Sequence, residues 1–191
     1  MRFAWVIVGG LVFFGSACSK PSPSAPELLR PATIKDIMDS MVDPSGDFMF
    51  ESVQQIADEN GVREKAPHTP KEWDEARRHV FVLLEAPNLL TMEGRKVAQP
   101  GQKAENPNVE LQPEEIQKKI DSDRSAFVRR ARRLQDAASQ AMKAVEARDK
   151  DALLVANDKI DKACENCHLH YWYPNDKRAQ EAAKEDGIVD E

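Results

Sequence analysis

The sequence predicts an all-α protein, and its composition and its apolar spacing both predict this class. Glycine is sparse, with 8 residues in 191, and aromatic residues make up only 6% of the chain. Ala, Glu, Lys, Arg and Leu dominate instead, which is typical of helices. Apolar residues also recur at spacings of three and four in four separate segments. The length of the chain is typical of a single domain.

The first predicted helix starts near Thr33, because Thr33 and Asp36 have the spacing of a capping box. Its apolar face consists of Ile34, Ile37, Met38, Met41 and Val42. Pro44 interrupts this helix, since the residue before a proline is pushed out of the α region. The pattern then resumes through Phe48, Val53 and Ile56. We therefore expect a kinked or broken helix that ends near Gly61.

The second predicted helix has a clearer start at Thr69-Pro70-Lys71-Glu72, which combines a capping box with proline at the first helical position. Its inner face consists of Trp73, Ala76, Val80, Leu83 and Leu84. Pro87 should bend it before it continues through Leu89, Leu90 and Met92. A long polar loop follows over 94–112. Its length indicates either a surface excursion or a contact loop.

The third predicted helix opens at Pro113, with Glu114 and Glu115 near its positive N-terminal end. Its apolar positions are Ile116, Ile120, Phe127, Ala131, Leu134, Ala138, Ala141 and Val145. A tight turn over 148–150 makes the third and fourth helices antiparallel neighbours. The fourth helix carries Leu153, Ala156, Ile160 and Ala163 and should end at Pro174. The charged tail over 175–191 is expected to fray.

The most informative motif lies near the end of this fourth helix. Cys164-Glu165-Asn166-Cys167-His168 has the C-x-x-C-H pattern of covalent c-type haem attachment. Residues three and four apart share one face of a helix. Cys164 and Cys167 could then form thioethers to the two haem vinyl groups, and His168 could place an imidazole nitrogen on the iron. The motif thus predicts one haem c, with His168 as the proximal axial ligand.

Two other chemistries fit a bare C-x-x-C pair. A thioredoxin-like redox pair needs a βαβ context, whereas the flanks of this motif have a helical pattern. A structural zinc site needs two more ligands. The candidates are scattered without paired spacing; they are Cys18, His68, His79 and His170.

The N-terminus has the pattern of a secretory signal over residues 1–17. Arg2 supplies a positive charge, residues 3–14 are an apolar stretch too short to span a bilayer, and Gly15-Ser16-Ala17 are small. Cys18 follows directly, as in the lipobox of bacterial lipoproteins, which predicts lipidation of Cys18. Gly15 stands where leucine is usual, so ordinary cleavage after Ala17 stays open, with Cys18 as a free thiol. Export agrees with haem attachment outside the bacterial cytoplasm.

Residues 18–31 are rich in proline and serine, which indicates an extended tether before a domain at 32–174. Residue 19 is serine rather than aspartate, and the resemblance to bacterial lipoproteins then implies a lipid anchor on the periplasmic side of a bacterial membrane, the outer membrane rather than the inner. A soluble periplasmic protein is the alternative. Removal of residues 1–17 takes away only Arg2, so the net charge of −6 becomes −7. No nucleic-acid partner is expected, since that needs a concentrated basic face.

With the motif on the last of four helices, the chain resembles the class II cytochromes c, the cytochrome c′ group and its low-spin relatives. The resemblance rests on Cys164-x-x-Cys167-His168, on Tyr171 three residues later, on the helix order and on a methionine-bearing first helix. It implies an antiparallel up-down-up-down four-helix bundle with haem c among the helices, and Tyr171 as a haem-pocket contact. The family often has a basic residue after that aromatic. Trp172 stands there instead, and Lys177 and Arg178 are candidate substitutes for its propionate contact.

In this family the first helix covers the distal side of the iron, with either a methionine ligand or a non-ligating side chain. The resemblance favours Met38 as the distal ligand, with Met41 as the runner-up. Methionine on an apolar helical face is, however, usually core filler. His79 could be imagined as a second histidine ligand but has the setting of a solvated residue, and His170 faces away from His168 on a helix.

The predicted function is electron transfer through His168 and a methionine sulfur, because Met/His ligation raises the reduction potential. The alternative is a five-coordinate haem protein that binds NO or CO. No catalytic constellation stands out, so no enzyme activity is expected. The redox partner is not encoded in any motif, and the resemblance allows a homodimer. A basic run on the third helix is either a solvated face or a contact for propionates or an acidic partner; it comprises Arg129, Arg130, Arg132 and Arg133.

Overall fold

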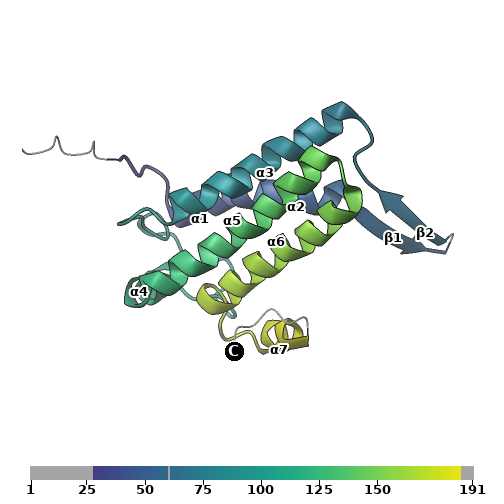
Figure 1. The fold of residues 1–191 in the computed structure, drawn as a ribbon. Helices are drawn as coiled ribbons and strands as arrows, with labels where there is room; N and C mark the ends of the chain where they lie inside the picture. The colour runs from purple at the N-terminus through teal and green to yellow at the C-terminus, as the bar shows by residue number, and fades with distance from the viewer. Residues whose placement is uncertain (1–27, 60, 186–191) are drawn as a thin grey trace, which may run out of the picture.

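The computed structural model describes residues 28–59 and 61–185, and this part of the chain is mostly helical with one small two-stranded sheet (Figure 1). The all-α class is therefore confirmed. The predicted leader at 1–17, Cys18 and most of the tether lie outside the described residues. Among the residues described, no helix is both long and apolar enough to cross a membrane.

The first helical segment consists of α1 (Ile34–Ile37), η1 (Met38–Val42) and α2 (Asp43–Ser52). The predicted capping box is present: Thr33 Oγ1 accepts the Asp36 N–H at 3.1 Å, and the Asp36 carboxylate accepts the Thr33 N–H at 2.8 Å. Pro44 has no N–H to give to the ladder. The chain passes it through one π-helical turn, in which the Asp43 N–H reaches the Met38 carbonyl. The expected distortion is thus a widened turn rather than a break.

The prediction that this helix continues to Gly61 is wrong. Val53 is extended, with φ −139° and ψ 123°, and residues 54–65 form an antiparallel hairpin of β1 (Gln54–Asp58) and β2 (Gly61–Lys65). Ile56 pairs with Arg63 in this hairpin. Gly61 has φ +113°, a conformation that glycine adopts without strain. The Asn-Gly dipeptide in the sequence is a strong hairpin signal.

Helix α3 (Pro70–Leu90) begins at the predicted capping box, where the Glu72 carboxylate accepts the Thr69 N–H at 2.8 Å. Pro87 lies inside the helix, and α3 ends three residues later. The third predicted helix is instead two helices, α4 (Pro113–Ser122) and α5 (Arg124–Ala147). Asp123 separates them, since its backbone leaves the helical region and its carboxylate caps α5 by accepting the Ala126 N–H at 2.9 Å.

Helix α6 (Lys150–Tyr171) follows α5 after a tight turn in which Arg148 is left-handed, with φ +53°. Asp149 caps α6 by accepting the N–H groups of Asp151 and Ala152. The chain thereby reverses, so α5 and α6 run antiparallel. The tail does not fray immediately, because residues 177–185 form α7 (Lys177–Glu185) against α6, with Ala183 buried.

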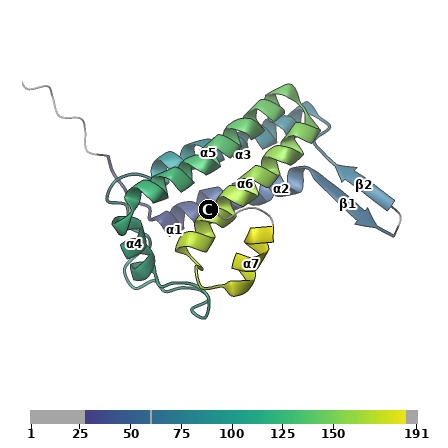
Figure 2. The same ribbon diagram turned by 60° about the horizontal axis from the view of Figure 1, so that its bottom comes forward.

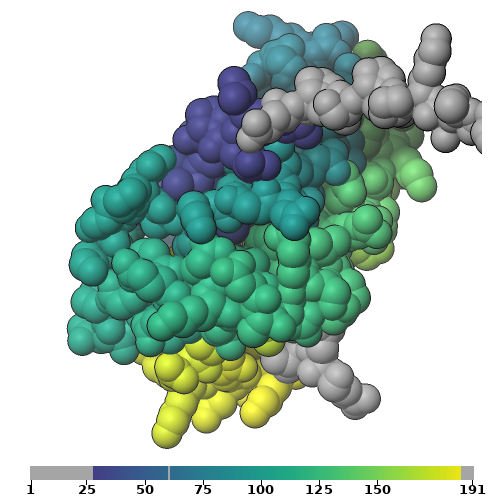
Figure 3. Space-filling view, turned by 90° about the vertical axis from the view of Figure 1, so that its left-hand side faces the viewer, coloured from purple at the N-terminus to yellow at the C-terminus, as the bar shows by residue number. Residues whose placement is uncertain are grey.

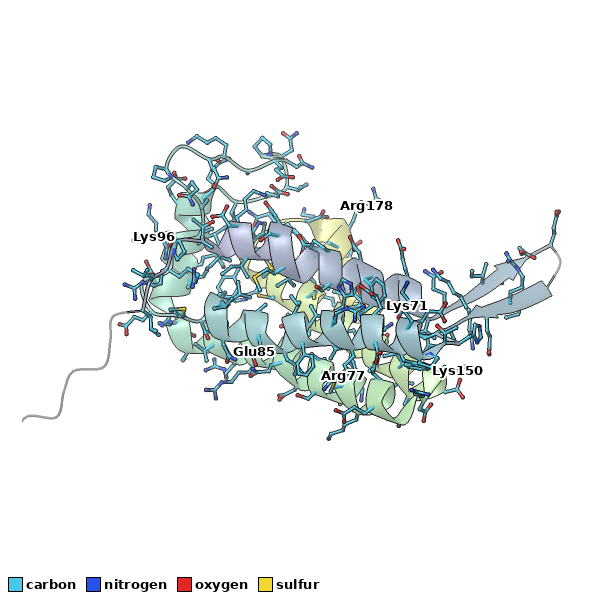
Figure 4. All side chains as sticks on the ribbon, turned by 90° about the horizontal axis from the view of Figure 1, so that it is seen from above. Lys71, Arg77, Glu85, Lys96, Lys150 and Arg178 are labelled. Atoms are coloured by element: carbon cyan, nitrogen blue, oxygen red, sulfur yellow. The ribbon has the colours of Figure 1, made fainter. Side chains whose placement is uncertain are left out.

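Helices α3, α5 and α6 pack side by side, and the α1–η1–α2 segment packs on α3 and α6 (Figure 1). Lys71 and Lys150 mark the starts of α3 and α6 at the hairpin end of the molecule, while Lys96 lies at the opposite end (Figure 4). Fully buried side chains fill the space between these helices and form one continuous core. Its largest members include Ile34, Met49, Val80, Leu83, Phe127, Leu153 and Ile160.

The loop between α3 and α4 is hydrogen-bonded to the start of the first helical segment and to the end of α6. The carbonyls of Lys96 and Val97 accept the N–H groups of Ile34 and Lys35 at 2.8 and 2.9 Å, so they cap the first helix. At the other end of the loop, the Leu111 N–H donates to the Trp172 carbonyl at 2.8 Å. Figures 2 and 3 show the loop and α4 covering this end of the molecule. The 94–112 segment is therefore a contact loop.

Candidate functional site

The C-x-x-C-H motif lies in the last two turns of α6. Cys164, Cys167 and His168 are all partly buried, as their position on an inward-facing edge of the helix requires. The His168 carbonyl accepts the N–H groups of both Trp172 and Tyr173, at 2.7 and 3.0 Å, and this ends the helix. The motif therefore lies on regular helix, and α6 ends one turn after His168.

A cavity of about 220 Å³ lies directly against these three side chains, and we call it the cysteine-side cavity. Its far wall is the first helical segment, with Met38, Val42, Gly46 and Phe50, and its floor comes from α3 and α5. The further lining residues are Asp43, Asp47, Leu90, Phe127, Arg130, Ala131, Leu134, Asp161, Ala163 and Glu165. The fold thus brings Met38 and His168, far apart in the sequence, to one cavity.

A second cavity of about 220 Å³ lies under the 94–112 loop, and we call it the loop-side cavity. It shares Met38, Asp43 and His168 with the cysteine-side cavity. Its other walls are Trp172 and Tyr173 after α6, residues at the start of the first helix, and the loop itself. These are Lys35, Asp39, Val97, Ala98, Lys103, Ala104, Glu105, Glu110, Leu111, Pro113 and Ile116. The two cavities are therefore neighbours, with Met38, Asp43 and His168 in the wall of each.

The electrostatics of the motif favour neutral ligands. Burial raises the pKa of both Cys164 and Cys167 to about 12, so the thiols are protonated near neutral pH. Burial also lowers the pKa of His168, although the nearby Asp43 and Glu165 carboxylates oppose this. A neutral imidazole is the form that binds a metal. Partial desolvation raises the pKa of Asp43, which lines both cavities.

These properties bear on the two alternative chemistries of a C-x-x-C pair. A redox-active pair has a depressed thiol pKa and sits in an electropositive setting, the opposite of what burial does here. A structural zinc site needs four ligands. In the described part of the chain, no group of three or more His, Cys, Asp or Glu side chains is placed to hold a metal ion. The geometry supports neither alternative.

The side chains around the motif are fixed by contacts to α5 and to the end of α6. Arg133 Nη1 donates to the buried Asn166 Oδ1 at 3.2 Å, and Tyr173 Oη donates to Glu165 Oε2 at 2.6 Å. Tyr171, predicted as a haem-pocket contact, lines neither cavity. It is wholly buried and packs edge-on against Phe127, with ring centroids 5.5 Å apart. Its contribution to the site is to anchor the end of α6.

The other sequence candidates are spread over the molecule. Met41 lines neither cavity and packs against the core, whereas Met38 lines both. His79 stacks on Phe48 at 4.1 Å, and its Nδ1 lies 3.3 Å from Ser45 Oγ, so it has partners on α2 and lies away from both cavities. His170 contacts the Tyr171 ring.

The four arginines of the third predicted helix divide between the cavity and the surface. Arg130 lines the cysteine-side cavity, and Arg133 contacts Asn166. Arg129 and Arg132 are exposed, as a solvated face requires. Lys177 and Arg178 lie on α7 and line neither cavity.

One wall of the site and one contact that joins its helices were not predicted from the sequence. One is the loop wall, which lacks any periodic pattern. The other is Asn157 on α6, a buried polar residue whose Nδ2 donates to the Met49 carbonyl on α2 at 2.5 Å. A polar residue in line with the apolar positions Leu153 and Ile160 was the available clue.

One comparison with known proteins gave a match. The family model described as Cytochrome C' matches residues 96–172, which include most of the loop, α4, α5, and α6 with the whole motif. Over these residues the chain is similar to the class II cytochromes c. This confirms the resemblance and implies a haem c cofactor. The comparisons with curated proteins and with solved structures gave no match.

The residues present fit the haem c that this cytochrome c′ relationship implies. Two thiols and an imidazole face one cavity from a single helix, and a thioether faces the same cavity from the opposite wall. Apolar side chains such as Val42, Phe50 and Leu134 provide the low-polarity surroundings that a macrocycle needs. The match begins at residue 96, so it does not extend to the segment that contains Met38.

The contact between Asn157 and the Met49 carbonyl leads to a first prediction. Asn157→Ala should lower the free energy of unfolding by about 0.5–1.5 kcal/mol, because the buried Met49 carbonyl loses the Asn157 donor and keeps only the Ser52 hydroxyl, at 2.7 Å. Urea denaturation of the purified protein measures this. Asn88→Ala is the matched control: Asn88 is an exposed helical asparagine, and its loss should change the free energy by no more than about 0.5 kcal/mol. Equal effects of the two substitutions would contradict the assigned role.

Proposed function

We propose that this protein is a one-electron carrier with a single covalently attached haem c inside an up-down-up-down four-helix bundle. The observation that carries the proposal is the shared cavity, which Cys164, Cys167, His168 and Met38 all line. The family match supports the haem. The antiparallel α5–α6 pair and the packing of α3 and the first helical segment support the bundle.

Each residue has a distinct role in this proposal. The Sγ atoms of Cys164 and Cys167 would attach the haem covalently, and the His168 imidazole would bind its iron. The Met38 sulfur would be the second iron ligand from the protein. When bound, haem c provides an iron that exchanges one electron. Ligation by His168 and Met38, with the apolar side chains of the cavity around them, would raise the reduction potential.

Electron transfer is favoured over gas binding by the position of Met38. Its side chain lines both cavities together with His168, as a distal ligand must, whereas Met41 lines neither. A gas-binding site would need this position to be held by a group that does not coordinate iron. In this proposal the protein carries electrons to or from a separate redox partner protein.

We also propose that the domain works in the periplasm, anchored through lipidated Cys18 to the outer membrane. The support comes from the sequence: a leader at 1–17, small residues before Cys18, and a proline-rich tether over 18–31. Covalent haem attachment outside the bacterial cytoplasm agrees with export. The tether would let the domain meet a partner at a distance from the bilayer.

The covalent attachment is tested by replacing both thiols. Cys164→Ala with Cys167→Ala should abolish covalent haem, because no sulfur is left to form the thioethers. Haem staining of a denaturing gel measures this directly. As the control, Cys18→Ala should keep a fully stained band once exported. A stained band in the double variant would disprove attachment through the motif.

The distal ligand is tested by two methionine substitutions on the same helical segment. The native oxidised protein should be low-spin, with a weak near-infrared sulfur-to-iron band. Met38→Ala should abolish that band, lower the reduction potential and let CO bind the reduced haem, since thioether sulfur favours ferrous iron. Absorption spectra and potentiometry measure these changes.

Met41→Ala is the matched control for this experiment. Because Met41 is only partly buried, its loss should cost less than the roughly 2–5 kcal/mol of a fully buried methionine and leave the spectrum unchanged. A spectral change in Met41→Ala alone would move the ligand to Met41. A native protein that is already high-spin and binds CO rapidly would instead favour the gas-binding function.

The membrane anchor is tested with Cys18→Ala in cells that export the protein. The native protein should fractionate with the outer membrane, and the variant should be a soluble periplasmic or unprocessed form, since the acyl chains are attached at this residue. Mass spectrometry of the mature N-terminus gives a second readout. An unmodified N-terminus on the native protein would rule out lipidation and leave cleavage after Ala17.

A further inference from the structure

The two cavities have a geometric relation that orients the haem. If His168 and Met38 are the axial ligands, the macrocycle lies between them, with its plane across the line that joins them. Both cavities are lined by both residues, so a group held between Met38 and His168 would extend into each cavity at a different edge. Cys164 and Cys167 line only the cysteine-side cavity. The vinyl edge of the haem therefore belongs there, and the opposite edge of haem carries its two propionate carboxylates.

We infer that the loop-side cavity receives the propionate edge of the haem, and that Lys103 and Lys35 bind its carboxylates there. This inference rests on the proposed haem function. It assigns the 94–112 loop a role in haem binding that no motif encodes. It also supplies the cations that Trp172, in place of a basic residue, does not provide.

The charges around the loop-side cavity distinguish the two lysines. Lys35 is already paired, with its Nζ 2.6 Å from Glu105 Oε1 and 3.1 Å from Asp39 Oδ2. Lys103 forms no ion pair with any residue that the structure describes, so its full charge is available to an anion. Lys103 is therefore the primary contact, and Lys35 contributes whatever charge Glu105 does not neutralise.

Acidic side chains also line this cavity, so their negative charges must be considered together with the two lysines. They are Asp39, Asp43, Glu105 and Glu110, with the Tyr173 hydroxyl and the His168 imidazole as the other titratable groups. The Glu110 carboxylate is occupied by the loop backbone, since it accepts the N–H groups of Glu105 and Asn106 at 2.9 and 3.1 Å. The two lysines are thus the cations against which an entering carboxylate can be paired.

The loop has the rigidity that such a contact needs. Its first part is fixed by the backbone bonds of Lys96 and Val97 to the first helix, and its last part by the bond of Leu111 to Trp172. Val97 is buried beneath it. Lys103 therefore projects from a segment that is tied at both ends to the elements carrying Met38 and His168.

The test uses the full-length holoprotein and measures the midpoint potential as a function of pH. Lys103→Gln should lower the potential, because a cation near the iron favours the less positive ferrous state. It should also move the carboxylate bend in the pH profile to higher pH, since losing a cation raises the pKa of a carboxylate. Lys35→Gln should act in the same direction, and Lys35→Arg should restore the native profile.

Glu105→Gln provides a change of opposite sign. It removes one negative charge and frees Lys35, so the potential should rise and the bend should move to lower pH. If the substitutions merely loosened the loop, the midpoint potential would shift in the same direction in Lys103→Gln and Glu105→Gln. In Asp43→Asn the bend should persist, which distinguishes a haem carboxylate from titration of Asp43.

Lys96→Gln is the matched control, because Lys96 belongs to the same loop but does not line the loop-side cavity. Haem staining is read first, and an unstained native protein would reject the haem function and this inference together. In stained protein, equal shifts in Lys103→Gln and Lys96→Gln, or no shift in Lys103→Gln, would overturn the inference alone. A shift confined to the two cavity lysines supports it.

Discussion

The site depends on one geometric constraint, the distance between α6 and the first helical segment. Three of the proposed haem-binding atoms come from five consecutive residues of α6, so the helix itself sets their relative positions. The fourth, on Met38, must come from a separate segment. The side chain of Asn157 joins the two by donating to the Met49 carbonyl at 2.5 Å. Beyond this contact the helices leave room for the two cavities, and Met38 and His168 line both of them.

The distribution of charge around these two cavities suits a buried redox centre. The thiols and the imidazole of the motif are held neutral by burial. The ionised side chains lie at the rims, where water still solvates them. An iron whose charge changes by one unit is then influenced by a few fixed charges at known positions. Lys103, Glu105 and Asp43 are among these, so in the proposed haem protein the surrounding chain would help to set the potential, as the iron ligands would.

The sequence predicted those parts of the fold that local chemistry decides. Two capping boxes, Thr33 with Asp36 and Thr69 with Glu72, gave two helix starts correctly, because such a box satisfies backbone donors within four residues. Cys164, Cys167 and His168 could be assigned together because one helical turn fixes their relation. The hairpin at 54–65 was missed, since the helical spacing of Val53 and Ile56 was given more weight than the Asn-Gly turn signal. The break at Asp123 was missed because the apolar period continues on both sides of it.

The remaining parts of the site depend on contacts between distant segments, which a single sequence does not specify. The loop wall exists because Lys96 and Leu111 bond to opposite elements, at Ile34 and Trp172. The choice between Met38 and Met41 shows a subtler limit. Sequence spacing assumes 3.6 residues per turn, but the chain from Met38 to Val42 follows a π-helical turn, which holds more residues per turn. The face on which each methionine lies is therefore set by how the helix accommodates Pro44. The same widened turn that disturbs the period directs Met38, and not Met41, to the cavities beside His168.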